Sequence, residues 1–286
     1  MTNRETYMRR MEEAFEGKRL FIPLIENDKE SFSVLDYGCG TGKLAYEIAI
    51  TYKNVTVVGY DPAADMIAEA NRLHSHERVT FVETLDKTKY DYILFNSVLH
   101  EVWSDFARKV VSDKRFTRQY LGNFIAGVST NNLKNKGTMI VRDGFSTGGG
   151  WAKCKIRDME DAASFVSELL DLSPFGYNLT FHEGYLKGDV DSIKEFLNKY
   201  TWGRESLLRE SQEIIHFWSE DDWGIMSPMF EISFMYTRAA DYFNYLDRLI
   251  VVNDEVDYEG IDIENSPWHP ISQWNTHIWV TLKRRY

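Results

Sequence analysis

The sequence predicts an α/β fold built on a mostly parallel sheet with helices on both of its faces. Short β-branched runs alternate with helical stretches between Phe32 and Gly144, and five β-α units fit in this interval. Continuous apolar runs that alternate with helices are typical of a parallel sheet covered on both sides. A glycine-rich turn after the first run and an acid after the second fit the same layout. The runs expected to form strands are residues 34–35, 55–58, 79–82, 92–95 and 139–141.

The composition bounds the class of protein. A chain of 286 residues, 43% hydrophobic and 27% charged, can bury one large α/β core and a smaller appendage. The formal net charge of -11 disfavours a protein whose whole surface binds nucleic acid. No apolar run approaches the roughly 20 residues of a membrane span, and no apolar stretch follows Met1 as in a signal peptide, so we expect a soluble, cytoplasmic protein. Cys39 and Cys154 are far apart and are expected to be free thiols.

Helical spacing of apolar residues predicts the elements between the strands. A helix or two should precede residue 32, and Gly148, Gly149 and Gly150 should form an exposed linker after the fifth strand. The apolar positions that indicate the later helices are Leu44 and Ile48, Met66, Ile67 and Ala70, and Phe116, Tyr120 and Phe124.

The first candidate binding element is the turn that begins at Asp36. Glycines at positions 38, 40 and 42 let the backbone bend sharply and approach a ligand closely. A dinucleotide fingerprint would need its third glycine at Lys43, and a phosphate-binding P-loop would need Ser or Thr at Leu44, so neither motif is present. The turn is therefore predicted to pass beneath a bound cofactor, with Asp36, Gly38, Gly40 and Gly42 as its binding residues. The alternative is that it is only a tight strand-to-helix connection.

Two more elements follow at the ends of later strands. Asp61 ends the second run, where an acid can accept hydrogen bonds from ribose hydroxyls, and it can also cap the next helix. The run 92–95 opens into polar residues from Asn96 onward. Ligands of open α/β sheets bind beyond the carboxyl ends of the strands, which places these residues at the expected site.

These segments resemble the class I S-adenosylmethionine-dependent methyltransferases over residues 32–144. The resemblance implies a Rossmann-like sheet of seven strands, with residues 277–283 as the final antiparallel strand and residues 249–252 as the sixth. It implies that the glycine turn and Asp61 hold S-adenosylmethionine, and that residues 96–102, with Asn96, border the transferred methyl. The acid that the family often places after the third strand would fall at Leu85, so the adenine contact is assigned to Asp86 beside it or to a backbone group.

Methyl transfer needs an aligned acceptor and, for a hydroxyl, a route for its proton. His100 is the first candidate base because it lies just past the fourth strand and histidine titrates near neutral pH. Asp143 is the second. The structural alternatives are a core or helix-capping histidine and a loop acid. Glu101 and Trp103, from the same segment as His100, are assigned to the acceptor.

Residues 146–231 are too many for a simple connection and predict a mainly helical insertion after the fifth strand. Helical patterns cover residues 159–170 and 193–200. Trp202 and Arg204 combine a flat ring with a charge, which suits a substrate platform or lid. The alternative is that the aromatic residues form the core of the insertion. The cofactor domain would then consist of residues 1–145 and 232–286.

The sequence thus predicts methyl transfer from S-adenosylmethionine to an oxygen or nitrogen of a small molecule. Three rivals stay open: an RNA- or nucleotide-directed methyltransferase, an inactive cofactor-binding module, and a nicotinamide-dependent oxidoreductase, which Lys43 disfavours. Basic runs at residues 108–118 and 153–157 favour phosphate, so nucleic acid is a less favoured partner. No metal site is expected, because residues 74–77, with two histidines, are expected to form a solvated loop. The oligomeric state is not determined by the sequence.

Overall fold

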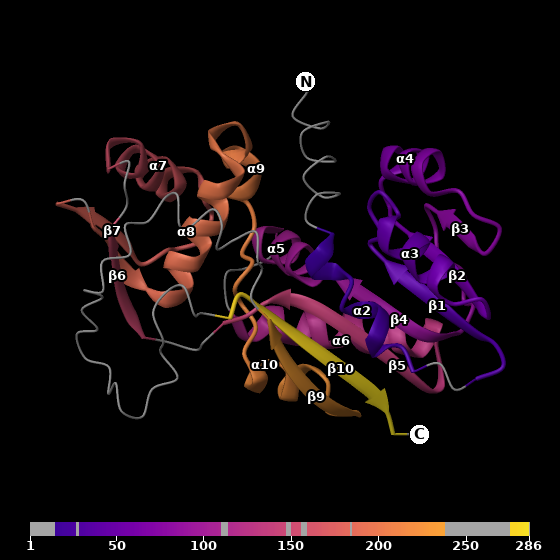
Figure 1. Cartoon of the computed structure of the whole chain (residues 1–286). Helices are drawn as coiled ribbons and strands as arrows, with labels where there is room; N and C mark the ends of the chain where they lie inside the picture. Colours follow the sequence, from indigo (N-terminus) through magenta and orange to yellow (C-terminus); the bar gives the residue numbers. More distant parts are fainter. Residues whose placement is uncertain are drawn as a thin grey trace.

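A seven-stranded sheet with the order β3-β2-β1-β4-β5-β10-β9 forms the centre of the molecule (Figure 1). The computed structural model describes residues 15–26, 29–109, 114–146, 150–155, 159–183, 185–237 and 275–285. Strands β1 to β5 are parallel, whereas β10 runs antiparallel to both β5 and β9. The strands are β1 (Phe32–Tyr37), β2 (Val55–Tyr60), β3 (Val79–Val82), β4 (Tyr90–Asn96), β5 (Leu133–Gly144), β9 (Phe230–Thr237) and β10 (His277–Arg284). The predicted mostly parallel seven-stranded sheet is confirmed.

Helices cover both faces of this sheet because alternate strand residues point to opposite sides. Val34 packs with helices on one face, and its neighbour Leu35 packs with helices on the other. The first face carries η1 (Glu16–Lys18), α2 (Phe21–Leu24), α3 (Lys43–Thr51) and α4 (Ala64–His74). The second carries α5 (Leu99–Lys109), α6 (Lys114–Asn132) and α10 (Glu220–Met226). The three helices predicted from residues 44–48, 66–70 and 116–124 are all present.

The position of the sixth strand corrects the prediction. Strand β9 at residues 230–237 pairs with β10 and occupies the place assigned to residues 249–252, which lie outside the described residues. Only alternate side chains of β9 approach the core: Phe230 is buried, whereas Glu231 is exposed. An edge strand with one solvated face lacks the continuous apolar run that marks the central strands, and this hid it in the sequence. The final strand was predicted correctly.

The segment after β5 has a hydrophobic core of its own. Helices α7 (Met159–Leu172) and α8 (Val190–Trp202) agree with the two predicted helices. They pack on a three-stranded antiparallel sheet with the order β6-β8-β7, which the sequence did not predict. This sheet comprises β6 (Trp151–Lys155), β7 (Leu179–His182) and β8 (Tyr185–Asp189), and η2 (Arg204–Ser206) and α9 (Leu207–Glu210) follow α8. In Figure 1 this part lies to the left of the main sheet.

The chain returns to the main core before β9. Trp218 and Trp223 are buried in the same cluster as the α5 and α6 face of the large sheet. Phe145, after β5, forms an isolated parallel bridge with Trp218. Two predicted features, the helix before residue 15 and the linker glycines Gly148 and Gly149, lie outside the described residues. Among the helices that are described, none is both long and apolar enough to cross a membrane.

Candidate active site

The glycine turn between β1 and α3 has a backbone that only glycine adopts easily. Gly38 and Gly42 have φ angles of 73° and 81°, and Gly40 has a φ of 53°. A Cβ on Gly38 would also lie 2.4 Å from the side chain of Val98. The backbone conformation therefore disfavours side chains along the turn, and Val98 leaves no room for one at Gly38. This fits the predicted turn beneath a bound cofactor.

Asp61 fastens this turn to the end of β2. Its Oδ2 accepts a hydrogen bond from the backbone N–H of Gly40 at 3.0 Å, and its Oδ1 accepts one from the N–H of Ala63 at 2.9 Å. The half-buried carboxylate thus has the capping role of the alternative interpretation, and its contact with ribose stays a prediction. It caps the chain leading into α4, and each oxygen keeps a second lone pair for a ligand hydroxyl.

Asp36 is a buried acceptor without a hydrogen-bond partner for its Oδ2 among the described residues. The residue is 1% exposed, in β1 just before the glycine turn. Burial raises the pKa of its carboxyl to about 7, against the lowering effects of the Lys18 charge and the Ala45 backbone. A buried oxygen without a partner costs free energy unless a ligand supplies a donor. Asp36 therefore fits a site that receives such a donor.

Asn96 and Asp86 differ in their surroundings. Asn96 ends β4, and its Oδ1 is a second buried acceptor with no hydrogen-bond partner in the described part of the chain. Asp86 lies in an exposed turn between β3 and β4, where its Oδ1 accepts from the N–H of Thr88 at 2.9 Å. Hydrogen bonds from Thr88 lower the pKa of the Asp86 carboxyl. The Asp86 side chain is thus engaged by its own turn, and its contact with adenine stays a prediction.

His100 and Asp143, predicted separately, form one buried pair. His100 lies in the first turn of α5, and its Nδ1 is 2.7 Å from Asp143 Oδ1. The backbone N–H of His100 donates to Asp143 Oδ2 at 3.1 Å, and the N–H of Gly144 donates to Oδ1 at 2.9 Å. Asp143 is part of β5 and 1% exposed, so it is not the loop acid of the alternative interpretation. The carboxylate holds the imidazole in place and leaves Nε2 directed away from it.

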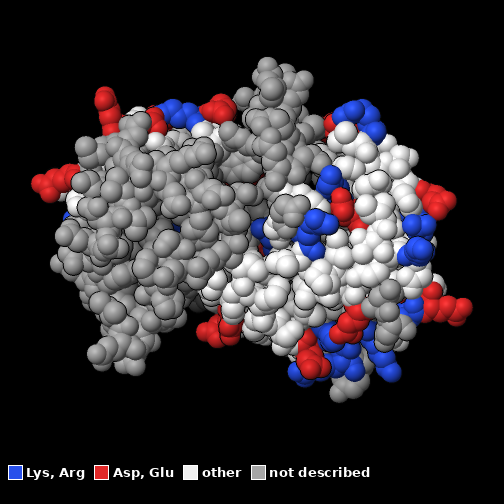
Figure 2. Space-filling view, in the orientation of Figure 1, with Lys and Arg blue, Asp and Glu red and all other residues white. Residues whose placement is uncertain are grey.

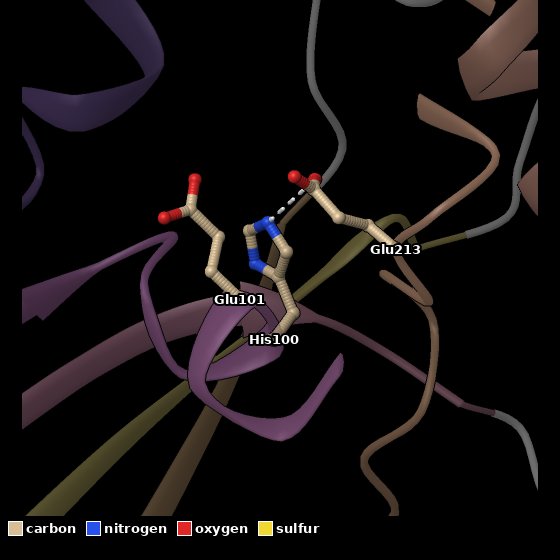
Figure 3. Close-up of side chains that lie close together, drawn as sticks. All are labelled: His100, Glu101 and Glu213. Atoms are coloured by element: carbon tan, nitrogen blue, oxygen red, sulfur yellow. Dashed lines mark ion pairs between the residues drawn. The ribbon is translucent and has the colours of Figure 1, made fainter. Parts of the chain in front are cut away.

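Two further carboxylates face His100 from the other side (Figure 3). Glu101 follows it in α5, and Glu213 comes from the loop between α9 and α10 with its Oε2 3.8 Å from His100 Nε2. Burial opposes a charge on the imidazole, but Asp143, Glu213 and Glu101 together raise the pKa of His100 to about 10. Glu101 is exposed as a whole residue, but its carboxyl group is surrounded by protein. This burial raises the pKa of the carboxyl to about 7. The charge of His100 lowers this pKa, and the charge of Glu213 raises it. Sequence reasoning missed Glu213 because no motif surrounds it.

A second buried polar group lies at the ends of β5 and β10. Arg142 donates from Nη1 to Ser97 Oγ at 2.7 Å, and burial lowers the pKa of this guanidinium to about 10. His277, at the start of β10, has a pKa well below the usual histidine range because of burial and the charges of Arg142, His216 and His100. His277 was predicted only as part of a strand, and its neutral imidazole adds to the polar groups at this end of the sheet.

The aromatic and basic residues assigned to the acceptor have packing roles in the structure. Trp103 is 2% exposed and lies 4.0 Å from the ring of Phe217, so it belongs to the core and not to an acceptor surface. Arg204 Nε donates to Asp161 Oδ1 at 2.9 Å, and its Nη1 pairs with Glu168. This guanidinium therefore joins η2 to α7. The half-buried Trp202 ring lies under the Arg209 guanidinium at 5.7 Å, also within the segment after β5.

Comparisons with known proteins agree with the fold and the turn. Residues 7–108 match a family model described as a methyltransferase domain. A chain from the complex between the Haloferax volcanii Trm112 methyltransferase activator and its proposed methyltransferase is 10% identical, with a TM-score of 0.50, covering 99% of this chain and 96% of that one. A proposed O-methyltransferase from Nostoc punctiforme PCC 73102 is 12% identical, with a TM-score of 0.50, covering 98% of this chain and 59% of that one. No curated protein matches the chain.

The fold and the family match define the class of protein. The fold is similar to that of solved methyltransferases, and the matched domain contains the glycine turn after β1. The predicted resemblance to the class I S-adenosylmethionine-dependent methyltransferases is confirmed. Residues 7–108 carry the matched methyltransferase domain, and this match supports an enzyme that uses S-adenosylmethionine.

Proposed function

We propose that the enzyme transfers a methyl group from S-adenosylmethionine to an oxygen or nitrogen of a small-molecule acceptor held beside His100. The observation that carries the proposal is the buried pair of His100 and Asp143 at the carboxyl ends of β4 and β5. Strand β4 is the neighbour of β1, which leads into the glycine turn. Ligands of open α/β sheets bind at this edge, so the pair and the turn would face one site.

Four groups would hold the cofactor. The glycine turn would pass beneath it, Asp61 would accept from its ribose hydroxyls, and Asp36 and Asn96 each offer a buried acceptor that has no hydrogen-bond partner among the described residues. S-adenosylmethionine supplies a methyl group activated by the sulfonium charge and is left as S-adenosylhomocysteine. The unsatisfied oxygens of Asp36 and Asn96 support this fit, because native proteins rarely leave buried acceptors unpaired.

The roles of His100 and Asp143 follow from their geometry. Asp143 is too deeply buried to touch an acceptor and acts as a positioning residue that binds Nδ1 of His100. Nε2 of His100 is then the nitrogen that meets the acceptor. When a hydroxyl is methylated, its proton must leave as the new bond forms, and His100 is the candidate group to take it, with Asp143 stabilising the resulting charge. Only the neutral imidazole can accept this proton, and the raised pKa of His100 means that this form becomes common only at alkaline pH or when the charge of the neighbouring carboxylates is neutralised.

The segment after β5 would contribute to the acceptor site through Glu213. We propose the predicted insertion at residues 146–231, with its independently packed part ending earlier than residue 231. Glu213 approaches His100, whereas Trp218 and Trp223 pack in the main core, so the part that is independent of the large sheet ends before residue 218. Trp202 and Arg204 would then support this segment and not contact the acceptor.

The charges of the described residues do not favour a nucleic-acid acceptor. Arg108 and Lys109, from the predicted basic run, both pair with Asp105. Figure 2 shows basic and acidic side chains intermixed on the described part of one face. A protein surface that binds nucleic acid usually carries a patch of predominantly basic residues. We therefore retain a small molecule as the proposed acceptor.

A screen for S-adenosylhomocysteine production over pools of metabolites and RNA tests the proposal. The proposed function predicts cofactor-dependent turnover with a metabolite fraction and none with RNA. The Gly40→Val variant serves as the control without a cofactor site. Turnover with RNA alone would contradict the proposed acceptor class.

A further inference from the structure

We infer that His100, Glu101 and Glu213 form a binding site for a first-row divalent metal ion such as Mn²⁺ or Zn²⁺. Each of the three residues offers one ligand atom, and all three atoms lie within 4.8 Å of one another. Among the described residues this is the only group of at least three histidine, cysteine or acidic side chains with such spacing. Figure 3 shows the two carboxylates and the imidazole turned toward a common space.

The imidazole is prepared for this role by Asp143. A metal-bound histidine usually donates its other ring N–H to a carboxylate, which fixes the tautomer and the direction of the free nitrogen. Asp143 does this at 2.7 Å from Nδ1. His100 is 7% exposed, and its Nε2 lies 3.8 Å from Glu213 Oε2, which is beyond hydrogen-bond distance. A buried nitrogen is thus directed at two carboxylates without binding either one.

Glu213 is brought to this place by a firmly held loop. Lys199 Nζ donates to the backbone carbonyl of Glu213 at 2.9 Å, and Glu195 accepts from the N–H of Ile215 at 2.6 Å. The N–H of Ile214 donates to Ser104 Oγ in α5 at 2.9 Å. These bonds attach the loop both to α8 and to the helix that carries His100. The backbone position of Glu213 is therefore set in advance of binding, and only its side chain has to adjust.

The donor set selects the kind of ion. One imidazole nitrogen with two carboxylates suits first-row transition ions better than Ca²⁺ or Mg²⁺, which prefer oxygen ligands alone. Such ions bind these atoms at about 2.0–2.2 Å, so adjacent ligand atoms lie about 3.0–3.6 Å apart. The observed spread of up to 4.8 Å is wider than this, so the glutamate side chains must turn inward when the ion binds. Water and the acceptor would complete the coordination.

The consequence for catalysis rests on the proposed function. An ion at this place would lower the pKa of an acceptor hydroxyl within its reach, which favours oxygen acceptors over nitrogen. His100 would then be a ligand, and the acceptor proton would leave to solvent. The ion would also join α5 to the loop after α9, because its ligands come from both.

Titration of Mn²⁺ into the full chain without cofactor, followed by electron paramagnetic resonance of the free ion, tests the site. We expect one Mn²⁺ per chain, displaced by Zn²⁺. Glu101→Gln and Glu213→Gln keep the side-chain shape and should each weaken binding at least tenfold. Glu231→Gln, on the exposed side of β9, is the matched control and should bind as the wild type does.

A second readout does not depend on variants. Bound Mn²⁺ should broaden the imidazole proton signals of His100 and leave those of His76, which lies beside Tyr46, sharp. Equal affinity of the wild type and Glu213→Gln, or sharp His100 signals at saturating Mn²⁺, would overturn the inference. Failure to bind S-adenosylhomocysteine would overturn the proposed function alone, because the Mn²⁺ measurements contain no cofactor.

Discussion

Asp143 accepts hydrogen bonds from both the backbone N–H and the Nδ1 of His100, and so joins the end of β5 to the first turn of α5. This double contact fixes the position of the helix as well as the direction of the imidazole. Asp143→Asn keeps the shape but removes the charge, and should lower the free energy of unfolding by about 1.5–3 kcal/mol. Urea denaturation measures the loss. The affinity for S-adenosylhomocysteine should stay within about twofold of wild type.

Asp105→Asn is the matched control for this substitution. Asp105 is an exposed partner of Lys109, and loss of such a surface pair should change stability by no more than about 0.5 kcal/mol. Equal effects of the two substitutions would contradict a structural role for the Asp143 contact.

Asp36 should make stability depend on pH. Its folded-state pKa is about 7, above the ordinary value of 3.8, so the unfolded chain releases this proton more readily than the folded chain does. The contribution of Asp36 to the free energy of unfolding is fully present below pH 3.8 and is lost as the pH rises through 7. Asp36→Asn removes the ionisation and should be stabilised relative to wild type more at pH 8 than at pH 5.5 in urea denaturation. The same difference at both pH values would contradict the raised pKa.

Gly40→Val should abolish cofactor binding and leave a folded protein. The positive φ of Gly40 costs a side chain about 1–2 kcal/mol, and the added atoms would stand where the cofactor is expected. Calorimetry with S-adenosylhomocysteine should show a loss of at least a hundredfold in affinity. The control is Gly127→Ala in α6, where an added Cβ has no neighbour within 4 Å. This variant should bind normally and be slightly more stable, because alanine favours helix.

A pair of substitutions tests whether the part around the large sheet binds the cofactor without help from the segment after β5. Asp61→Ala removes the acceptor for Gly40 and Ala63 and the expected ribose contact, and should weaken S-adenosylmethionine ten- to a hundredfold. Arg204→Ala breaks a partly exposed pair with Asp161 and should cost about 1 kcal/mol or less of stability without changing cofactor affinity. A matching loss of affinity in Arg204→Ala would show that this segment closes over the cofactor.

The sequence was informative where chemistry and local structure coincide. The central strands are buried on both faces and appear as continuous apolar runs. The glycine turn needs backbone angles that other residues rarely adopt, so its glycines are visible in the sequence. His100 and Asp143 were recognisable because each directly follows or ends such a strand. Their pairing was not predictable, since it depends on how β5 and α5 pack.

The parts that escaped prediction depend on contacts distant in sequence. The strands of the small sheet are short, and β9 is an edge strand, so neither has a continuous apolar run. Glu213 lies in a loop whose course is set by Lys199, Glu195 and Ser104, and nothing adjacent in sequence marks it. Trp103 was assigned to the acceptor because it borders the site in sequence, although it faces inward from α5.

The most direct test of the central claim is calorimetric titration of S-adenosylhomocysteine and S-adenosylmethionine into the purified full chain. We expect one site per chain with micromolar affinity, together with a stabilisation of about 2.7 kcal/mol when the ligand is present at about 100 times its dissociation constant. Binding should be lost in Gly40→Val and kept in Gly127→Ala. Absence of binding heat and of any thermal shift at millimolar concentrations of both ligands would contradict the assignment of this chain as an S-adenosylmethionine-dependent methyltransferase.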